Sequence, residues 1–161
     1  MNKRTWLLAG AAVALAALAG CATAPSPVSV TDTVARTPQL STLAKLINDA
    51  GLAETLRGTG PYTLFAPTDD AFKAVPAKTL ADLAANKELL AATLTFHVLP
   101  GKVTAADVKN GAAKTVNGAS VALAKSGTFV TVEDAVVQQA DLPATNGVVH
   151  VIDRVLIPPK K

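Results

Sequence analysis

The sequence predicts an α+β domain in which one early β-strand joins a sheet built mainly from the second half of the chain. Three observations lead to this class. Apolar residues recur at helical spacing through much of residues 38–99. After residue 110, short β-branched runs alternate with Asn-Gly and Ser-Gly turn signals. One run in the helical half, residues 62–67 (YTLFAP), is β-branched and aromatic and is bounded by prolines, which is typical of a buried strand.

The first half is expected to contain several short helices. Thr37 suits a helix cap, Pro38 suits the first helical position and Gly51 suits the stop, so an amphipathic helix is predicted over residues 38–50. Further helices are expected at residues 52–58, 68–75 and 77–85, with a longer one over residues 87–99 that ends before Pro100.

The second half is expected to consist of strands. Asn117-Gly118 lies between two extended runs and predicts a hairpin. Ser126-Gly127 forms the next turn, and residues 128–133 and 134–142 are interpreted as core strands, with an exposed partner surface as the alternative. Asn146-Gly147 leads into a final strand that stops at Pro158-Pro159.

The N-terminus indicates secretion. Lys3 and Arg4 precede an apolar run over residues 7–19, which is shorter than the ~20 residues of a membrane span. Residues 1–20 are therefore interpreted as a signal peptide. The following "LAGC" ends at Cys21, the only cysteine, and resembles the lipobox of bacterial lipoproteins. That resemblance implies lipid on Cys21 and membrane anchoring, and a plain signal peptide with an incidental cysteine is the alternative.

The remaining chain divides into a tether, one domain and a tail. Residues 21–30 are interpreted as a flexible tether, residues 31–159 as the domain and residues 160–161 as a basic tail. Ala22, rather than aspartate, follows the cysteine, which favours the outer membrane if the host has one. The chain has 15 Lys and Arg against 12 Asp and Glu, but both ends are basic and the folded part is near neutral. We therefore expect no nucleic-acid partner.

Two adjacent carboxylates raise the question of catalysis. Asp69 and Asp70 follow Thr68, and they suit either a metal or acid/base site or the first turn of a helix. Thr68 or Asp69 as a helix cap would stabilise by ~1 kcal/mol, and Phe72 would then turn inward. We favour the cap, and we expect Asp69→Ala to lower stability while Asp69→Asn is nearly neutral.

The remaining candidates for chemistry are the two histidines, His97 and His150. A metal site needs further protein ligands, and neither His-x-x-x-His nor Cys-x-x-Cys spacing occurs. Each histidine is therefore expected to be half-buried and bonded to backbone or to a carboxylate. The sequence also has no nucleophile elbow and no phosphate-binding loop. We expect neither an enzyme nor a cofactor.

Three segments resemble signatures of the fasciclin (FAS1) domain family, in the family order and spacing: residues 63–72 (TLFAPTDDAF), 94–108 (LTFHVLPGKVTAADV) and 146–158 (NGVVHVIDRVLIP). The resemblance covers residues 30–159. It implies a wedge-shaped antiparallel β-sandwich flanked by short helices, and adhesion or surface interaction rather than catalysis. The motif residues that it assigns to structure are Thr68, Asp69, Phe72, Phe96, His97, His150 and Asp153.

One motif position departs from the family pattern. The family usually has tyrosine where Phe96 stands, so the integrin binding linked to that segment in animal members is not carried over. Asp69 occupies a position that the family fills with Asn or Asp, which favours a capping role. We expect an envelope-anchored lipoprotein that binds a protein or polysaccharide. The alternative is a periplasmic carrier of a small apolar ligand held between helices and sheet.

Overall fold

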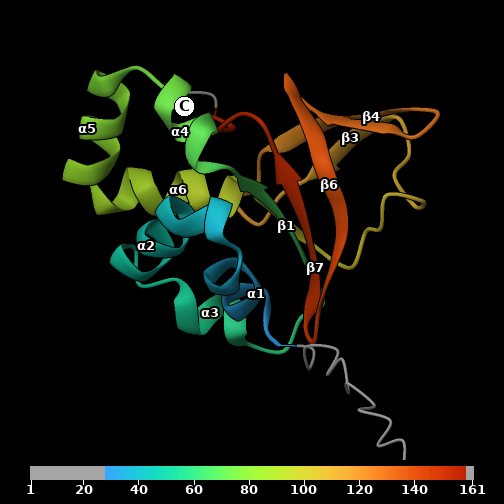
Figure 1. Ribbon diagram of the computed structural model, residues 1–161, viewed down its shortest axis with the longest axis horizontal. Helices are drawn as coiled ribbons and strands as arrows, with labels where there is room; N and C mark the ends of the chain where they lie inside the picture. The colour runs from blue at the N-terminus through green and yellow to red at the C-terminus, as the bar shows by residue number, and fades with distance from the viewer. Residues whose placement is uncertain (1–27, 159–161) are drawn as a thin grey trace, which may run out of the picture.

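The computed structural model describes residues 28–158, which form a layer of short helices packed against one curved sheet (Figure 1). The helices are α1 (Val30–Arg36), a 3-10 turn η1 (Pro38–Leu40), α2 (Ser41–Asp49), α3 (Ala53–Arg57), α4 (Asp69–Ala74), α5 (Ala77–Ala85) and α6 (Lys87–Phe96). Among residues 28–158, no helix has the length and apolar character needed to cross a bilayer.

The sheet has seven strands, in the order β2-β1-β7-β6-β5-β4-β3. They are β1 (Tyr62–Pro67), β2 (Val98–Pro100), β3 (Gly111–Lys114), β4 (Ser120–Ser126), β5 (Phe129–Val132), β6 (Ala135–Ala144) and β7 (Gly147–Ile152). β1 runs parallel to β7, and every other pair is antiparallel. The α+β class is therefore confirmed, and so is the insertion of the early strand, because β1 lies between β2 and β7.

β6 bends the sheet toward closure. Its pairing with β7 shifts register between Val137 and Gln139 and again between Gln139 and Leu142. Such bulges bend a strand and increase its twist. At the open side, the amide of Val116 donates to the carbonyl oxygen of Val98 at 2.8 Å, which joins the loop after β3 to β2. The sheet is thus a near-barrel with one side covered by helices.

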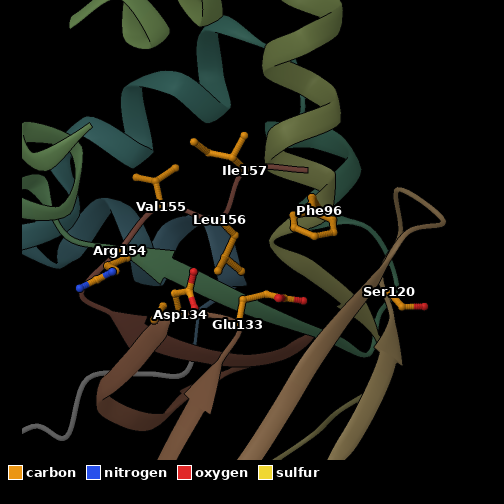
Figure 2. A pocket seen from close by; sticks show the side chains of 9 residues that line it. Phe96, Ser120, Glu133, Asp134, Arg154, Val155, Leu156 and Ile157 are labelled. Carbon is orange, nitrogen blue, oxygen red and sulfur yellow. The ribbon is translucent and has the colours of Figure 1, made fainter. Parts of the chain in front are cut away.

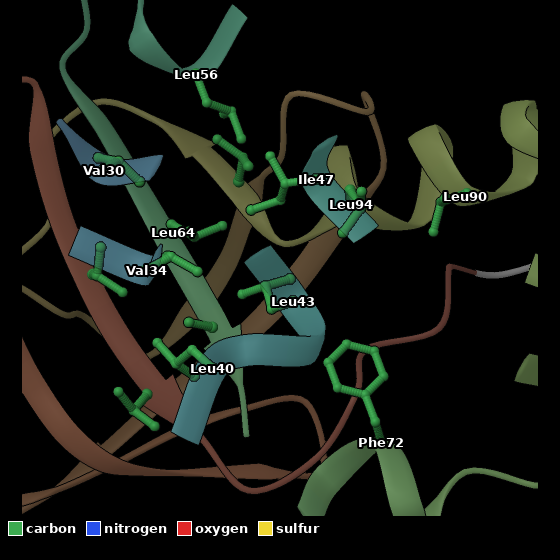
Figure 3. Close-up of a cluster of buried hydrophobic side chains, with 14 of the residues drawn as sticks. Val30, Val34, Leu40, Leu43, Ile47, Leu56, Leu64, Phe72, Leu90 and Leu94 are labelled. Carbon is green, nitrogen blue, oxygen red and sulfur yellow. The ribbon is translucent and has the colours of Figure 1, made fainter. Parts of the chain in front are cut away.

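Two apolar clusters fill the two faces of the central strands. In β1, Leu64 and Ala66 face the helices, whereas Phe65 faces the inside of the curved sheet, as alternation along a strand requires. Figure 3 shows part of the helix-side cluster, which contains residues from each of the helices named above, including η1. Its buried members are Val30, Val34, Leu40, Leu43, Ile47, Leu56, Leu64, Ala66, Phe72, Leu83, Leu90, Leu94, Val98, Val149 and Val151.

Some element boundaries differ from expectation. The helix predicted to reach residue 99 ends at Phe96, and residues 98–100 form the edge strand β2 instead. The final strand ends at Ile152, and residues 153–158 continue without regular strand pairing. Val30 already belongs to α1 and is fully buried. The expected signal peptide, Cys21 and basic tail lie outside the described residues.

Candidate functional site

The two ends of β7 define two ends of the domain. At the Gly147 end, the amide of Thr145 donates to the carbonyl oxygen of Val28 at 2.9 Å, so the first described residue lies beside the β6–β7 turn. At the Ile152 end, residues 153–158 leave the sheet toward α4 (Figure 1). Six strand residues separate these ends by about 17 Å. The chain that precedes the domain therefore enters at the end opposite to residues 153–158.

A hollow of about 460 Å³ opens at the Ile152 end of the domain. Figure 2 shows Val155 and Ile157 on one side of it and the turn residues Glu133 and Asp134 on the other, with Leu156 between them. Phe96, Ser120, Ala135 and Arg154 complete the lining. Apolar and charged groups therefore face each other across this hollow.

The hollow continues into two neighbouring ones. Val155 and Ile157 also line a hollow of about 350 Å³ against Val75 and Pro76 at the end of α4. Asp153 lines that hollow and a third, of about 370 Å³, beside Asp69. Because they share lining residues, the three form one continuous surface. We call the residues that line them the distal surface.

His97 fixes the wall that carries Leu156. Its Nε2 accepts a hydrogen bond from the Leu156 amide at 2.9 Å, and its Nδ1 lies 2.8 Å from the carbonyl oxygen of Thr93. These partners require a neutral ring with the proton on Nδ1. Burial lowers the pKa of His97 to about 4, which agrees with the neutral form. Phe96, its neighbour, is 2 % exposed and lines the hollow with a ring that has no hydroxyl.

Asp153 and Glu133 fix the rest of the frame. Oδ1 of Asp153 accepts from the Val136 amide at 2.7 Å, and the Asp153 amide donates back to the Val136 carbonyl oxygen at 3.2 Å. Glu133 adopts a left-handed backbone conformation with φ of 52°, and its carboxylate accepts from the Ala122 amide at 2.6 Å. The residues around the hollow are therefore held in place by bonds to backbone.

His150 serves another part of the fold. Its Nε2 lies 2.8 Å from the carbonyl oxygen of Val103, its Nδ1 accepts from the Asp141 amide at 3.2 Å, and its ring stacks on Phe65. Both histidines are bonded to backbone, as expected, but each is only 1 % exposed rather than half-buried. Within residues 28–158, no three His, Cys, Asp or Glu side chains gather as metal ligands.

The Thr68–Phe72 motif caps two helices. Thr68 Oγ1 accepts from the Ala71 amide at 3.2 Å and caps α4, and Phe72 is buried in the helix-side cluster. Asp69 does not cap its own helix. Its carboxylate accepts from the Thr42 amide at 2.8 Å and from the Ser41 hydroxyl at 2.7 Å, so it caps α2. Burial, the largest single effect, raises the pKa of Asp69, but these hydrogen bonds together lower it below its usual value.

Asn146 is a structural residue that the sequence presents only as part of a turn. Its Nδ2 donates to the carbonyl oxygens of Leu56 at 2.7 Å and Gly58 at 2.9 Å, and its Oδ1 accepts from the Val30 amide at 2.9 Å. It therefore joins α1, α3 and the β6–β7 turn. An Asn-Gly pair indicates a turn whether or not the amide has distant partners, so spacing alone could not reveal this role.

A small apolar cavity of about 50 Å³ lies at the helix–sheet junction, lined in part by Leu56, Tyr62 and Val98. Pockets that enclose small ligands usually measure roughly 300–1,000 Å³. In the part of the chain described, this cavity is too small for the apolar ligand of a carrier.

Comparison with known proteins identifies the family. The Fasciclin domain family model matches residues 38–158. "Protein sll1483" of Synechocystis is 42% identical over 136 residues, which cover 83% of this chain and 76% of that protein. "Immunogenic protein MPB70" of Mycobacterium bovis is 37% identical over 138 residues, covering 83% and 69%. "Cell surface glycolipoprotein MPB83" of the same species is 36% identical over 127 residues, covering 76% and 57%.

A solved structure has the same fold. The FAS1 domain pair of the insect cell adhesion molecule Fasciclin I superposes with a TM-score of 0.64 at 19% identity, covering 81% of this chain and 51% of that one. The sequence motifs, the inserted strand β1 and the family match over residues 38–158 agree with one another. This chain belongs to the fasciclin (FAS1) domain family.

Proposed function

We propose that this chain is a non-catalytic interaction module, held at the bacterial cell envelope by lipid on Cys21, whose distal surface binds a protein or polysaccharide. The position of Val28, the first described residue, carries the proposal. Seven residues lead from Cys21 to Val28, a reach of at most about 24 Å. Because Val28 lies at the Gly147 end of β7, the distal surface faces away from the membrane, where a partner has access.

The chemistry of the site supports binding rather than catalysis. His97 uses both ring nitrogens to hold backbone groups, and the carboxylates of Asp153 and Glu133 accept backbone amides. Groups committed in this way are not poised for proton transfer. The names of two related proteins, a cell surface glycolipoprotein and an insect cell adhesion molecule, also support a surface role. For a host with two membranes we favour the outer one.

The test compares two charge insertions at opposite ends of the domain. Ile157→Lys places a charge on the distal surface, where Ile157 is 57 % exposed, and Thr59→Lys places one in an exposed loop at the tether end. Each variant replaces the wild-type gene in the native host. Attachment, aggregation and cross-linked partners are then measured at equal surface levels, with mass spectrometry of proteins, glycans and lipids.

We expect Ile157→Lys to lose about tenfold of the cross-linked partner, since an unpaired charge buried at a binding site costs at least that much, while Thr59→Lys keeps it. Deletion of the gene with no change in attachment or aggregation would contradict the adhesion role. Partner capture that is equal in both variants would place the binding site elsewhere on the domain.

A further inference from the structure

We propose that the distal surface binds a basic, partly apolar polypeptide segment, with a lysine or arginine head beside Asp134 and an aliphatic portion against Ile157. This inference rests on the proposed function and names the chemical class of its partner. It is argued from the shape of the surface, from its charge and from Asp134, the carboxylate lining this surface that has no side-chain partner within residues 28–158.

The shape favours an extended segment. Val155 and Ile157 line the hollows of about 460 and 350 Å³, so they form an apolar ridge between two grooves. Ile157 is 57 % exposed, whereas Leu156 and Phe96, which line the deeper part, are almost fully buried. An extended polypeptide that crosses the ridge can place side chains in both grooves at once, whereas a compact small molecule contacts only one groove.

The charge of the surface selects a cation. Its lining contains five carboxylates against two cations, and one of these cations, Lys73, is paired with Asp70 at 2.8 Å. Four carboxylates therefore remain against Arg154 alone: Asp69, Glu133, Asp134 and Asp153. Complementary charge steers association and excludes partners of the same sign, so an acidic segment is disfavoured here.

Asp134 is the carboxylate best placed to receive the head group. Asp69, Glu133 and Asp153 each accept backbone amides and serve the fold. The Asp134 carboxylate makes no hydrogen bond or ion pair with any other residue of the described chain, and Figure 2 shows it within the hollow, opposite Val155. Lysine and arginine carry an aliphatic stem below the charge, and that stem matches an apolar ridge beside a carboxylate.

The experiment uses the full-length lipidated protein in detergent and a fluorescein-labelled peptide of alternating lysine and leucine. One counterpart peptide has glutamate in place of lysine, and another has serine in place of leucine. Binding is measured by anisotropy at about 0.01 and about 0.15 M salt, between which the Debye length falls from ~30 to ~8 Å. We expect only the lysine–leucine peptide to bind well, and to bind more weakly at the higher salt.

Four variants locate the binding site. Asp134→Lys is expected to weaken the lysine–leucine peptide about tenfold, Ile157→Ser to weaken it several-fold, and Arg154→Ala to strengthen it several-fold, since these remove an attraction, an apolar contact and a repulsion. Asp49→Lys, which makes the same charge change at an exposed position on α2, is the control and is expected to have less than a twofold effect.

Several results would overturn the inference. These are failure of the lysine–leucine peptide to bind, equal binding of the glutamate peptide, and equal weakening by Asp49→Lys. A gain of about fivefold or more in a Lys160→Ser, Lys161→Ser double variant would assign the surface to the chain's own basic tail instead. If the envelope partner requires Ile157 but ignores Asp134→Lys, the proposed function stands and this inference fails. If the peptide binds while attachment never depends on the protein, the inference stands and the function fails.

Discussion

Asp69 links two helices because its carboxylate accepts from the first turn of a helix that begins 28 residues earlier at Ser41. No side chain from the N-cap position of α2 makes this bond. The residue preceding Asp69, Thr68, caps α4 by itself. The adjacent carboxylate is therefore free to serve another helix, and the motif holds α4 against α2.

Substitutions at Asp69 separate the hydrogen bonds from the charge. Asp69→Ala removes the acceptor for Thr42 and Ser41 and is expected to lower the free energy of unfolding by about 1 kcal/mol. Asp69→Asn keeps an oxygen for the Thr42 amide and is expected to lose less than half of that. Urea denaturation at pH 7 measures both. An Asn variant as unstable as the Ala variant would mean that the negative charge carries the effect.

The lowered pKa of Asp69 predicts that its contribution to stability depends on pH. The pKa of Asp69 is lower in the folded protein than in the unfolded chain, so its ionised form stabilises the fold above the unfolded value of about 3.9. This stabilisation is lost as the pH falls through the folded value. The difference between the wild type and Asp69→Ala should therefore begin to shrink as the pH falls below the unfolded value. A difference that stays constant between pH 7 and pH 2.5 would contradict this account.

The lowered pKa of His97 predicts that acid begins to destabilise the fold at a higher pH than protonation of the carboxylates would. Its pKa is about 4 when folded and about 6.5 when unfolded, so the unfolded chain binds the extra proton first as the pH falls. Stability from this residue is complete above pH 6.5 and declines toward pH 4, by at most about 1.4 kcal/mol per pH unit. His97→Gln keeps an acceptor for the Leu156 amide but does not titrate. Thermal unfolding at pH 7, 5.5 and 4.5 should therefore be flatter for this variant, and equal slopes would contradict the assignment.

At the level of elements, β1 and β7 approach so closely that side chains are excluded at one end of the pair. Tyr62 is in register with Gly147. A Cβ on Gly147 would overlap the carbonyl oxygen of Tyr62, and one on Gly60 would overlap that of Asn146. These glycines are required by the contact between backbones, since neither has a positive φ.

Two alanine substitutions distinguish this contact from ordinary turn strain. Gly147→Ala is expected to cost about 3 kcal/mol, because the backbones of β1 and β7 must separate. Gly127→Ala, at a φ of +61° with open space around it, should cost about 1–2 kcal/mol from backbone strain alone. Denaturant titrations of both variants provide the comparison. Equal losses would mean that the parallel pair can separate at little cost.

The sequence predicts elements with clear ends better than elements without them. The sequence predicts β1 because prolines bound a β-branched and aromatic run. Both faces of the strand are buried in the structure, which accounts for its apolar composition. β2 was missed because Val98 and Leu99 continue the apolar pattern of α6 and no stop signal precedes them. We predict no helix from the sequence where α1 lies, although Ser29 and Asp32 form a capping pair at its start. That signal was present in the sequence.

The distal surface could not be predicted in the same way. The facing walls of its hollow of about 460 Å³ come from the β5–β6 turn and from residues 153–158, and only the folded chain brings them together. Neither segment contains a spacing typical of a binding site. The sequence predicts a structural role for His97. Its partner could not be predicted, because the Leu156 amide is 59 residues away and a backbone group has no side-chain signature.

At the level of the whole molecule, the proposed lipid on Cys21 would determine which end of the domain is exposed. Cys21→Ser is expected to abolish incorporation of radiolabelled palmitate, since it removes the sulfur that we propose as the site of lipid attachment. It should also move the protein from the membrane fraction to the supernatant, because the variant lacks the acyl chains that would anchor it. Label that survives in the serine variant would contradict the lipobox assignment.

The placement of β7 has a consequence for the order of folding. This strand is the last to be synthesised, yet it occupies an interior position between β1 and β6. Helix α1 at the start of the domain also depends on the β6–β7 turn, because the Val30 amide donates to Oδ1 of Asn146. Contacts between such distant positions form slowly, since a long loop must close before they form. A nascent chain that ends before Gly147 lacks the middle of its sheet rather than an edge, so the domain folds only after its carboxyl end has been made.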